Sequence, residues 1–344
     1  MKTPFTPFFK RADTPLTRVS RCPFAPNHPL PFVADDATVH YVGDGCQLSY
    51  RWHDAFDVFV AVLEARFAPV DGSRLEIPIE SHLYDLHLVY QLTGSSNFMP
   101  LASSQTRPVL SLPARHHMQV YAPPGSGVIH ILPDGQTLHF ALAVVVPKGD
   151  WVTRYPAVGN SPMEELIRSR KEMAHEYRYL GPTPSTESVL FWINRLLNTP
   201  PRSGMSLDDA LNGPMVRLIK EHSDELADRH RARQLVATVR LWVADYVSGM
   251  DGSQPPPSAE LSAQVFATTP RRIRELHRKF HAQKFAQFIS YCRVEEAKQR
   301  LRAGESIAAV ALKLGWADVP TFSKHFKKST GQTPGHFIKE TAHK

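Results

Sequence analysis

The segment from Glu305 to Pro334 constrains the fold of this chain more than any other. Its first half places apolar residues at the helical spacing i, i+3, i+4 and i+7: Ile307, Val310, Ala311 and Leu314. Gly315 then supplies the backbone freedom that ends a helix. Asp318 is a suitable N-cap for a following helix, and Pro320 fits within the first turn of that helix. The segment therefore predicts two short helices joined by a tight turn.

The second of these helices has an apolar face and a basic face. Phe322 and Phe326 lie four residues apart, so we expect both to point inward. A helix, a turn and a basic second helix are the elements that place a helix in the major groove of DNA, where its N-terminal residues face base edges. The residues assigned to base reading are Val319, Thr321 and Lys324, and those assigned to phosphates are Lys327 and Lys328.

A weaker version of the same pattern precedes this segment. Residues 259–266 predict a helix, residues 267–269 a turn and residues 270–281 a second helix. The inward face of this second helix consists of Ile273, Leu276, His277 and Phe280. Its base-reading candidates are Arg271, Arg272 and Arg274, and its phosphate-binding candidates are Arg278 and Lys279. Because arginine can bind guanine through two hydrogen bonds, this helix is the stronger candidate for specific contacts.

Together these motifs resemble the AraC/XylS family of transcription regulators. The resemblance rests on Gly315-Trp316, Asp318, Phe322-Ser323-Lys324, Phe326-Lys327-Lys328 and Gly331-x-Thr333-Pro334. Lys324 stands where the family usually has arginine, and Ala267 and Ala282 stand where it usually has glycine. The resemblance implies tandem helix-turn-helix units joined by a helix, for which the apolar spacing over residues 285–301 is suited.

The positive charge of the chain is concentrated at this end. Residues 251–344 contain 16 Lys and Arg against 8 Asp and Glu, a net charge of +8, whereas the whole chain carries +7. The preceding 250 residues are therefore close to neutral. An excess of positive charge on the outward faces of two helices is what the neutralisation of DNA phosphates requires.

The N-terminal half predicts a different class of structure. Short apolar runs broken by Gly, Pro and Asn indicate strands at residues 58–63, 86–92, 118–121, 128–132 and 138–146. Many short strands with such turns favour a β-sandwich or small barrel, and the resemblance implies a cupin-like domain that binds an effector. Helical patterns follow at residues 163–180, 185–197 and 206–228, and residues 229–233 are the expected junction.

We therefore predict an α+β chain of four parts. They are an N-terminal arm with little structure of its own (1–36), a cupin-like sensor domain (37–160), a helical dimerisation section (161–231) and an all-α tandem helix-turn-helix domain (232–344). Aromatic residues that could line an effector cavity are Trp52, Tyr90, Tyr121 and Phe140, although core packing is the more common role for any one of them.

The sequence indicates neither a metal site nor a cofactor. Histidines such as His87, His117 and His139 are present in the N-terminal half, but their spacing is not that of cupin enzymes. Three scattered cysteines and an N-terminus without a continuous apolar core favour a cytoplasmic protein.

The predicted function is that of a sequence-specific, DNA-binding transcription regulator and not an enzyme. The expected partners are double-stranded DNA, RNA polymerase, an unidentified small-molecule effector and a second copy of the chain, with no membrane. Two alternatives stay open. In one, a protein partner controls the regulator in place of a small molecule. In the other, a metal-dependent cupin enzyme is fused to a DNA-binding domain.

Overall fold

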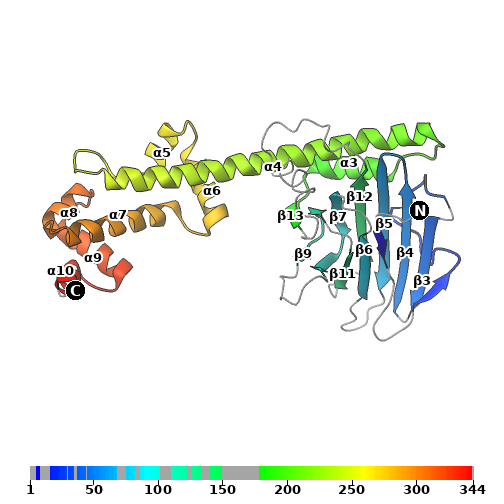
Figure 1. Cartoon of the computed structure of the whole chain (residues 1–344), viewed down its shortest axis with the longest axis horizontal. Helices are drawn as coiled ribbons and strands as arrows, with labels where there is room; N and C mark the ends of the chain where they lie inside the picture. Colours follow the sequence, from blue (N-terminus) through cyan, green and yellow to red (C-terminus); the bar gives the residue numbers. More distant parts are fainter. Residues whose placement is uncertain are drawn as a thin grey trace. The chain divides into compact units, whose positions relative to one another are not determined.

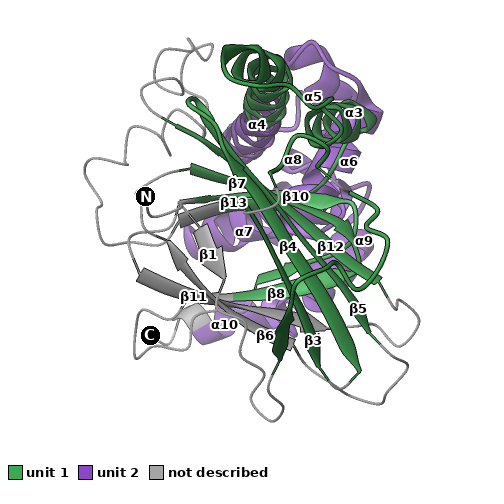
Figure 2. Cartoon of the chain, turned by 90° about the vertical axis from the view of Figure 1, so that its right-hand side faces the viewer, with its two compact units in different colours: residues 1–227 green, residues 228–344 purple. Residues whose placement is uncertain are grey.

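The computed structural model describes residues 5–7, 16–28, 30–34, 37–43, 45–67, 75–81, 86–100, 110–121, 125–132, 139–148 and 178–342 (Figure 1). The chain divides into two compact units, residues 1–227 and residues 228–344 (Figure 2). Among the described residues, no helix combines the length and the apolar character needed to cross a membrane.

The first unit contains two antiparallel sheets. The larger has eight strands in the spatial order β13 (Arg178–Pro184), β10 (His116–Tyr121), β7 (Leu86–Thr93), β12 (His139–Pro147), β5 (Val58–Phe67), β4 (Cys46–Asp54), β3 (Thr38–Gly43) and β2 (Thr17–Val19). The smaller has five, in the order β1 (Phe5–Pro7), β6 (Leu75–Ser81), β11 (Gly125–Leu132), β8 (Ser95–Pro100) and β9 (Leu110–Leu112).

The larger sheet is buried on both faces. Val58, Val60 and Val62 of β5 belong to a core shared with α3 (Glu187–Leu197) and the first part of α4 (Met205–Ser248). The alternate residues of β5 belong to a second core, which includes Phe98 of β8 and Leu112 of β9. A strand covered on both sides is apolar at nearly every position, which explains the continuous run from Val58 to Leu63. The unit thus has a helical layer, a large sheet and a small sheet.

This arrangement confirms the α+β class with an antiparallel N-terminal sandwich and C-terminal helices. Four of the five predicted strand segments lie wholly in strands, and residues 139–146 of the fifth lie in β12, whereas residue 138 is outside the described residues. The segment expected as an arm is more ordered than its Pro-rich sequence suggests, since residues 5–7 pair with β6, residues 17–19 pair with β3, and Leu30 and Phe32 are buried.

Two helical predictions need correction. Most of the helix expected at residues 163–180 lies outside the described residues, but its end at Leu180 is wrong, because residues 178–184 pair with β10. The helix expected at residues 206–228 also continues past its predicted end, since α4 is one helix of 44 residues. No Gly or Pro occurs between Met215 and Ser248, so the sequence offers no residue that would end the helix there.

The second unit is all helical. It contains the last part of α4 and α5 (Ala259–Val265), α6 (Pro270–His281), α7 (Phe285–Arg302), α8 (Ile307–Lys313), α9 (Val319–Thr330) and α10 (Pro334–Ala342). Each of these helices contributes at least one apolar residue to a shared core, and α6 contributes Ile273. The unit therefore has a hydrophobic core of its own.

Candidate nucleic-acid interface

The first helix-turn-helix unit consists of α5 and α6. The hydroxyl of Ser258 accepts a hydrogen bond from the backbone N–H of Leu261, which caps α5. The hydroxyl of Thr269 accepts one from the N–H of Arg272, and Pro270 occupies the first position of α6. These caps fix α6 at the predicted boundaries, because each satisfies a backbone donor that the helix itself cannot pair.

Two alanines in this unit adopt a backbone conformation that favours glycine. Ala267 in the turn has a φ of 46°, and Ala282 at the C-terminal end of α6 has a φ of 50°. A left-handed conformation costs about 1–2 kcal/mol for a residue that has a Cβ atom. This unit therefore forms its turn and its helix end without glycine at either position.

His277 on the inner face of α6 is part of the core. It is 1% exposed, its Nδ1–H donates to the carbonyl oxygen of Gln283 at 2.9 Å, and its Nε2 accepts from Nη1 of Arg240 at 2.9 Å. Burial lowers the pKa of His277, so its ring is neutral, as these two hydrogen bonds require. The imidazole packs against Phe285 and Phe288 in the place of an aromatic side chain.

The basic residues of α6 all lie on its exposed face, where the sequence predicted them: Arg271, Arg272, Arg274, Arg278 and Lys279. Arg271 pairs with Glu275 one turn along the helix, at 2.7 Å, and Arg274 pairs with Glu260 of α5. Each of these side chains is at least half exposed. Exposed ion pairs contribute little free energy, so both arginines can exchange their carboxylate for another acceptor.

The second unit, α8 and α9, follows the predicted geometry closely. Ser306 caps α8, Gly315 has a φ of 75°, and the carboxylate of Asp318 accepts a hydrogen bond from the backbone N–H of Thr321 at 2.6 Å. The hydrogen bonds to Thr321 lower the pKa of Asp318, which keeps this cap ionised. The N-cap, the turn glycine and Pro320 in the first turn are thus confirmed.

The inner face of α9 is aromatic. Phe322 and Phe326 are fully buried, and the ring of Trp316 lies 4.8 Å from that of Phe322. The opposite face carries the predicted basic residues: Lys324, Lys327 and Lys328 are exposed, Val319 is 37% exposed and Thr321 is half-buried. The side chains assigned to DNA are therefore on the surface of this unit, and those assigned to the core are inside.

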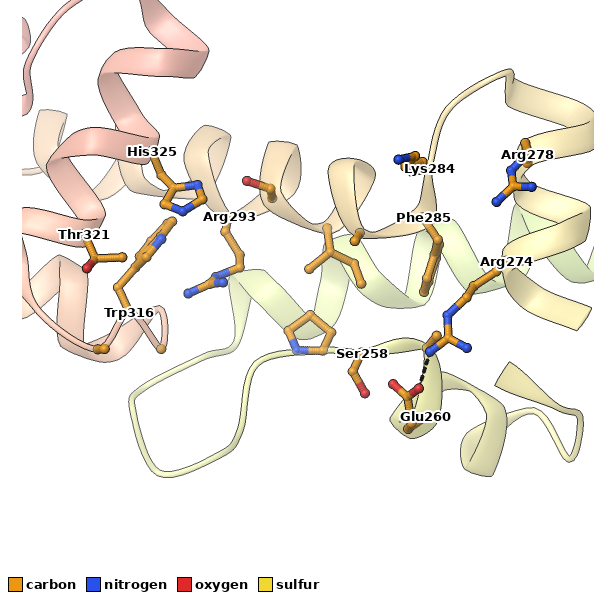
Figure 3. A pocket seen from close by; sticks show the side chains of 17 residues that line it. Ser258, Glu260, Arg274, Arg278, Lys284, Phe285, Arg293, Trp316, Thr321 and His325 are labelled. Atoms are coloured by element: carbon orange, nitrogen blue, oxygen red, sulfur yellow. Dashed lines mark hydrogen bonds and ion pairs between the residues drawn. The ribbon is translucent and has the colours of Figure 1, made fainter. Parts of the chain in front are cut away.

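A groove of about 650 Å³ is lined by residues of both helix-turn-helix units (Figure 3). Arg274 and Arg278 of α6 lie on one side, and Trp316, Thr321 and His325 lie on the other. Glu260 is the one acidic residue among the lining residues. Residues that the sequence assigned to base reading in separate helices, Arg274 and Thr321, therefore border one basic groove.

The groove also includes basic residues that the sequence analysis did not single out, namely Lys284 and Arg293. Nε of Arg293 donates to the carbonyl oxygen of Leu314 at 2.9 Å, and its guanidinium lies 4.0 Å from the ring of Trp316. Its buried Nη2 has no hydrogen-bond partner in the described part of the chain, and burial lowers its pKa to about 10. The available signal was the position of Arg293, four residues after Ile289 and eight after Phe285, which is the spacing of the inward face of α7.

Among the described residues, the aromatic side chains predicted to line an effector cavity are divided between the two faces of the large sheet. Tyr90 belongs to the core on the helical face of the large sheet, whereas Phe140 belongs to the core on the opposite face. Trp52 packs against the second core and stacks on Tyr50 at 5.1 Å. The side chain of Tyr121 lies outside the described residues.

Comparisons with known proteins agree with the C-terminal geometry. Residues 262–340 match the family model of a helix-turn-helix domain. Similar solved structures include fatty-acid-bound ToxT from Vibrio cholerae, at 12% identity over 83% of this chain and 96% of that chain, with a TM-score of 0.34. A DNA-binding transcriptional dual regulator from Escherichia coli is 21% identical over 31% of this chain and 94% of that chain, with a TM-score of 0.28.

The C-terminal domain of the response regulator AraT from Geobacillus stearothermophilus is 20% identical, over 31% of this chain and 84% of that chain, with a TM-score of 0.28. At these TM-scores the structural similarities add nothing to the family match. A comparison with curated protein sequences gives no significant match.

Proposed function

Because the chain carries an AraC-type helix-turn-helix domain at its C-terminus, we propose that this DNA-binding transcription regulator reads its operator with α6 and α9 together. One observation carries the proposal: both helices bury an apolar face, expose a basic face and border the same groove. Two such helices on one compact unit are suited to bind successive segments of the major groove on one side of the duplex.

Base reading is assigned to the N-terminal half of each helix. The residues that read bases on α6 are Arg271, Arg272 and Arg274. Those that read bases on α9 are Val319, Thr321 and Lys324. Phosphates are bound by Arg278, Lys279, Lys327 and Lys328, which follow on the same exposed faces. For Arg274 to bind a base, its ion pair with Glu260 must open, so binding exchanges a weak surface contact for a stronger one.

We propose that residues 1–227 control this DNA-binding activity by binding a small-molecule effector. We also propose that the protein is cytoplasmic, forms a homodimer and contacts RNA polymerase. Dimerisation is supported by α3, whose Phe191 is 57% exposed beside the half-buried Trp192. A stabilising shift in melting temperature with a candidate effector would support small-molecule control. Control by a protein partner predicts no such shift for any small molecule.

The proposal is tested by selecting binding sites for the full chain from a random duplex library. The expected result is an enriched site with two conserved segments, one for each recognition helix. Affinity for that site should fall steeply with salt, because several Lys and Arg residues displace counterions. Recovery of no preferred sequence, together with binding that does not respond to salt, would contradict the proposal.

A further inference from the structure

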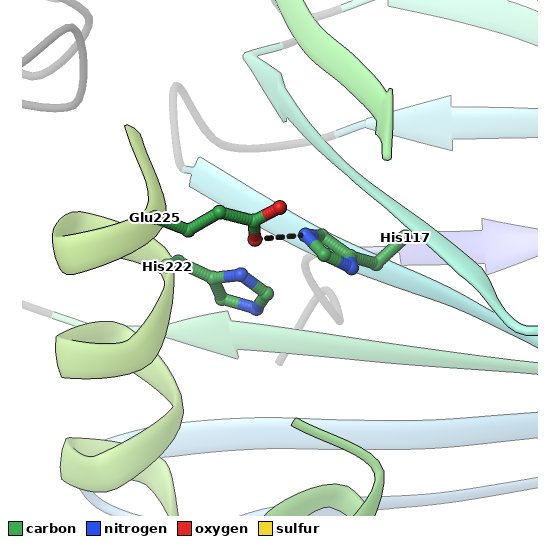
Figure 4. Close-up of side chains that lie close together, drawn as sticks. All are labelled: His117, His222 and Glu225. Atoms are coloured by element: carbon green, nitrogen blue, oxygen red, sulfur yellow. Dashed lines mark ion pairs between the residues drawn. The ribbon is translucent and has the colours of Figure 1, made fainter. Parts of the chain in front are cut away.

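Three side chains that the sequence does not connect meet on the helical face of the large sheet. His117 comes from β10, and His222 and Glu225 come from α4 (Figure 4). Each offers one ligand atom, and these atoms all lie within 4.8 Å of one another. His222 and Glu225 share a face of α4 because they are three residues apart. The group lies entirely within the first unit.

The two imidazoles are oriented by hydroxyl groups behind them. Nδ1 of His117 lies 3.1 Å from Oγ of Ser185, and Nε2 of His222 lies 2.7 Å from the hydroxyl of Tyr90. The nitrogens that remain are Nε2 of His117 and Nδ1 of His222. In metal sites a histidine ligand is generally held in this way, with the nitrogen that does not bind the metal hydrogen-bonded to an outer group.

The remaining nitrogens and the carboxylate form an incomplete polar cluster. Nε2 of His117 lies 3.2 Å from Oε2 of Glu225. His222 is fully buried, yet its Nδ1 has no hydrogen-bond partner among the residues that the structure describes. An unsatisfied buried nitrogen is unfavourable. When Nε2–H of His222 donates to the hydroxyl of Tyr90, its Nδ1 carries a lone pair that can bind a cation.

We infer that His117, His222 and Glu225 form a binding site for a divalent transition-metal cation, for which Zn²⁺ is the best match. Two imidazole nitrogens and one carboxylate are a ligand set that zinc accepts, whereas magnesium and calcium require more oxygen ligands. The 3.2 Å separation of the His117 and Glu225 atoms suits two ligands that each lie about 2.1 Å from one ion.

The burial of the three residues indicates how the cation reaches the site. The side chain of His117 is 1% exposed, whereas that of Glu225 is 24% exposed. The cation therefore enters from the side of Glu225, where water can supply a further ligand. Once bound, it links β10 to α4 and satisfies the free nitrogen of His222. This inference does not depend on the proposed function.

The competing explanation is a metal-free cluster held by the His117–Glu225 ion pair and the hydroxyl contacts. Both explanations predict that substitutions here affect stability, so stability alone does not separate them. They differ in whether the unmodified chain takes up zinc. They also differ in whether Ser185, which contacts no metal, changes the affinity for zinc.

The test is calorimetric titration of the full chain with Zn²⁺ after removal of metal by a chelator. We expect one zinc per chain at this site and a rise in melting temperature on binding. Glu225→Gln replaces the most exposed ligand with a side chain of the same shape, and should weaken zinc binding at least ~100-fold. Ser185→Ala should weaken it ~10–100-fold, because it frees the ring of His117.

His40→Gln is the matched control, since His40 is also a buried histidine of the first unit but is paired with Ser49 on another strand pair. It should bind zinc like the unmodified chain. Circular dichroism of each variant confirms that it is folded. If the folded unmodified chain takes up no zinc, or if Glu225→Gln takes up zinc with unchanged affinity, the site is a metal-free cluster and the inference is wrong.

Discussion

The two helix-turn-helix units share one geometry but build it from different residues. The second unit places Gly315 and Gly331 where φ is positive and fills its core with Phe322 and Phe326. The first unit places Ala267 and Ala282 in the left-handed region, and its core position is taken by His277. Both still present a basic helix to the same groove.

The difference shows that the geometry is fixed by the core and the caps rather than by the glycines. The second unit achieves it without strain. The first tolerates two unfavourable alanine conformations and a titratable core residue, because α5, α6 and α7 pack around them. The first unit should therefore be the less stable and the more sensitive to pH, and it is also the one with arginines at the base-reading positions.

The largest effect is expected for Trp316→Ala in residues 228–344. Trp316 is 7% exposed and packs against Phe322 and the guanidinium of Arg293, so its loss should reduce the free energy of unfolding by about 3–5 kcal/mol. Tyr291→Ala, which removes a 56% exposed aromatic of the same unit, should cost within about 0.5 kcal/mol. Urea denaturation measures both. A Trp316→Ala fragment with unchanged stability and lost DNA binding would instead place the indole against DNA.

The next effect separates base reading from phosphate binding. Arg274→Ala should lose about 1–3 kcal/mol of binding free energy on the selected site and relax the preference at one base position. Lys328→Ala should weaken binding to selected and random duplexes by the same factor, because Lys328 is assigned to a phosphate, which carries no sequence information. Competition gel shifts on both duplexes give the comparison. Equal losses on both duplexes for Arg274→Ala would mean that α6 meets DNA with another face.

The third prediction concerns the pH dependence of stability, which should arise from His277 in the first helix-turn-helix unit. Because burial lowers the folded pKa of His277, the unfolded chain takes up a proton first as pH falls below about 6.5, so stability falls from that point. Above that pH, the contribution is fully present. Thermal melting of residues 228–344 between pH 8 and pH 5 should show this loss, and His277→Phe should reduce it. An unchanged pH profile in His277→Phe would assign the loss to other groups.

The smallest effect concerns the backbone. Ala282→Gly should stabilise the second compact unit by ~1 kcal/mol, because glycine removes the cost of a left-handed alanine. Gly331→Ala makes the reverse change at the corresponding end of α9, where an added Cβ would meet no atom within 4 Å, and should destabilise by a similar amount. Equal and opposite shifts in denaturation midpoint would show that the two helix ends differ only in residue type.

Much of the second helix-turn-helix unit, α8 and α9, could be predicted from the sequence. The cap Asp318, the turn at Gly315 and the buried pair Phe322 and Phe326 were all identified. These features depend on local spacing and on hydrogen bonds between residues three or four positions apart, which the sequence displays directly.

Other features were decided by tertiary structure. The pairing of residues 178–184 with β10 replaced an expected helix end, because sheet pairing joins segments that lie far apart in the chain. Arg274 and Thr321 lie in separate helices, as the sequence predicted. The sequence does not show that both border one groove, which results from the packing of these helices with α7.

The sequence by itself determined the two basic helices α6 and α9, the N-cap of α9 and the sign of the charge on their outer faces. Tertiary structure alone decided that His117 meets His222 and Glu225, since a strand and a helix more than 100 residues apart supply them. The physical reason is the distance along the chain over which each kind of interaction acts. Helix periodicity and capping act within one or two turns, whereas a polar cluster in a core depends on which distant segments the burial of apolar surface packs together.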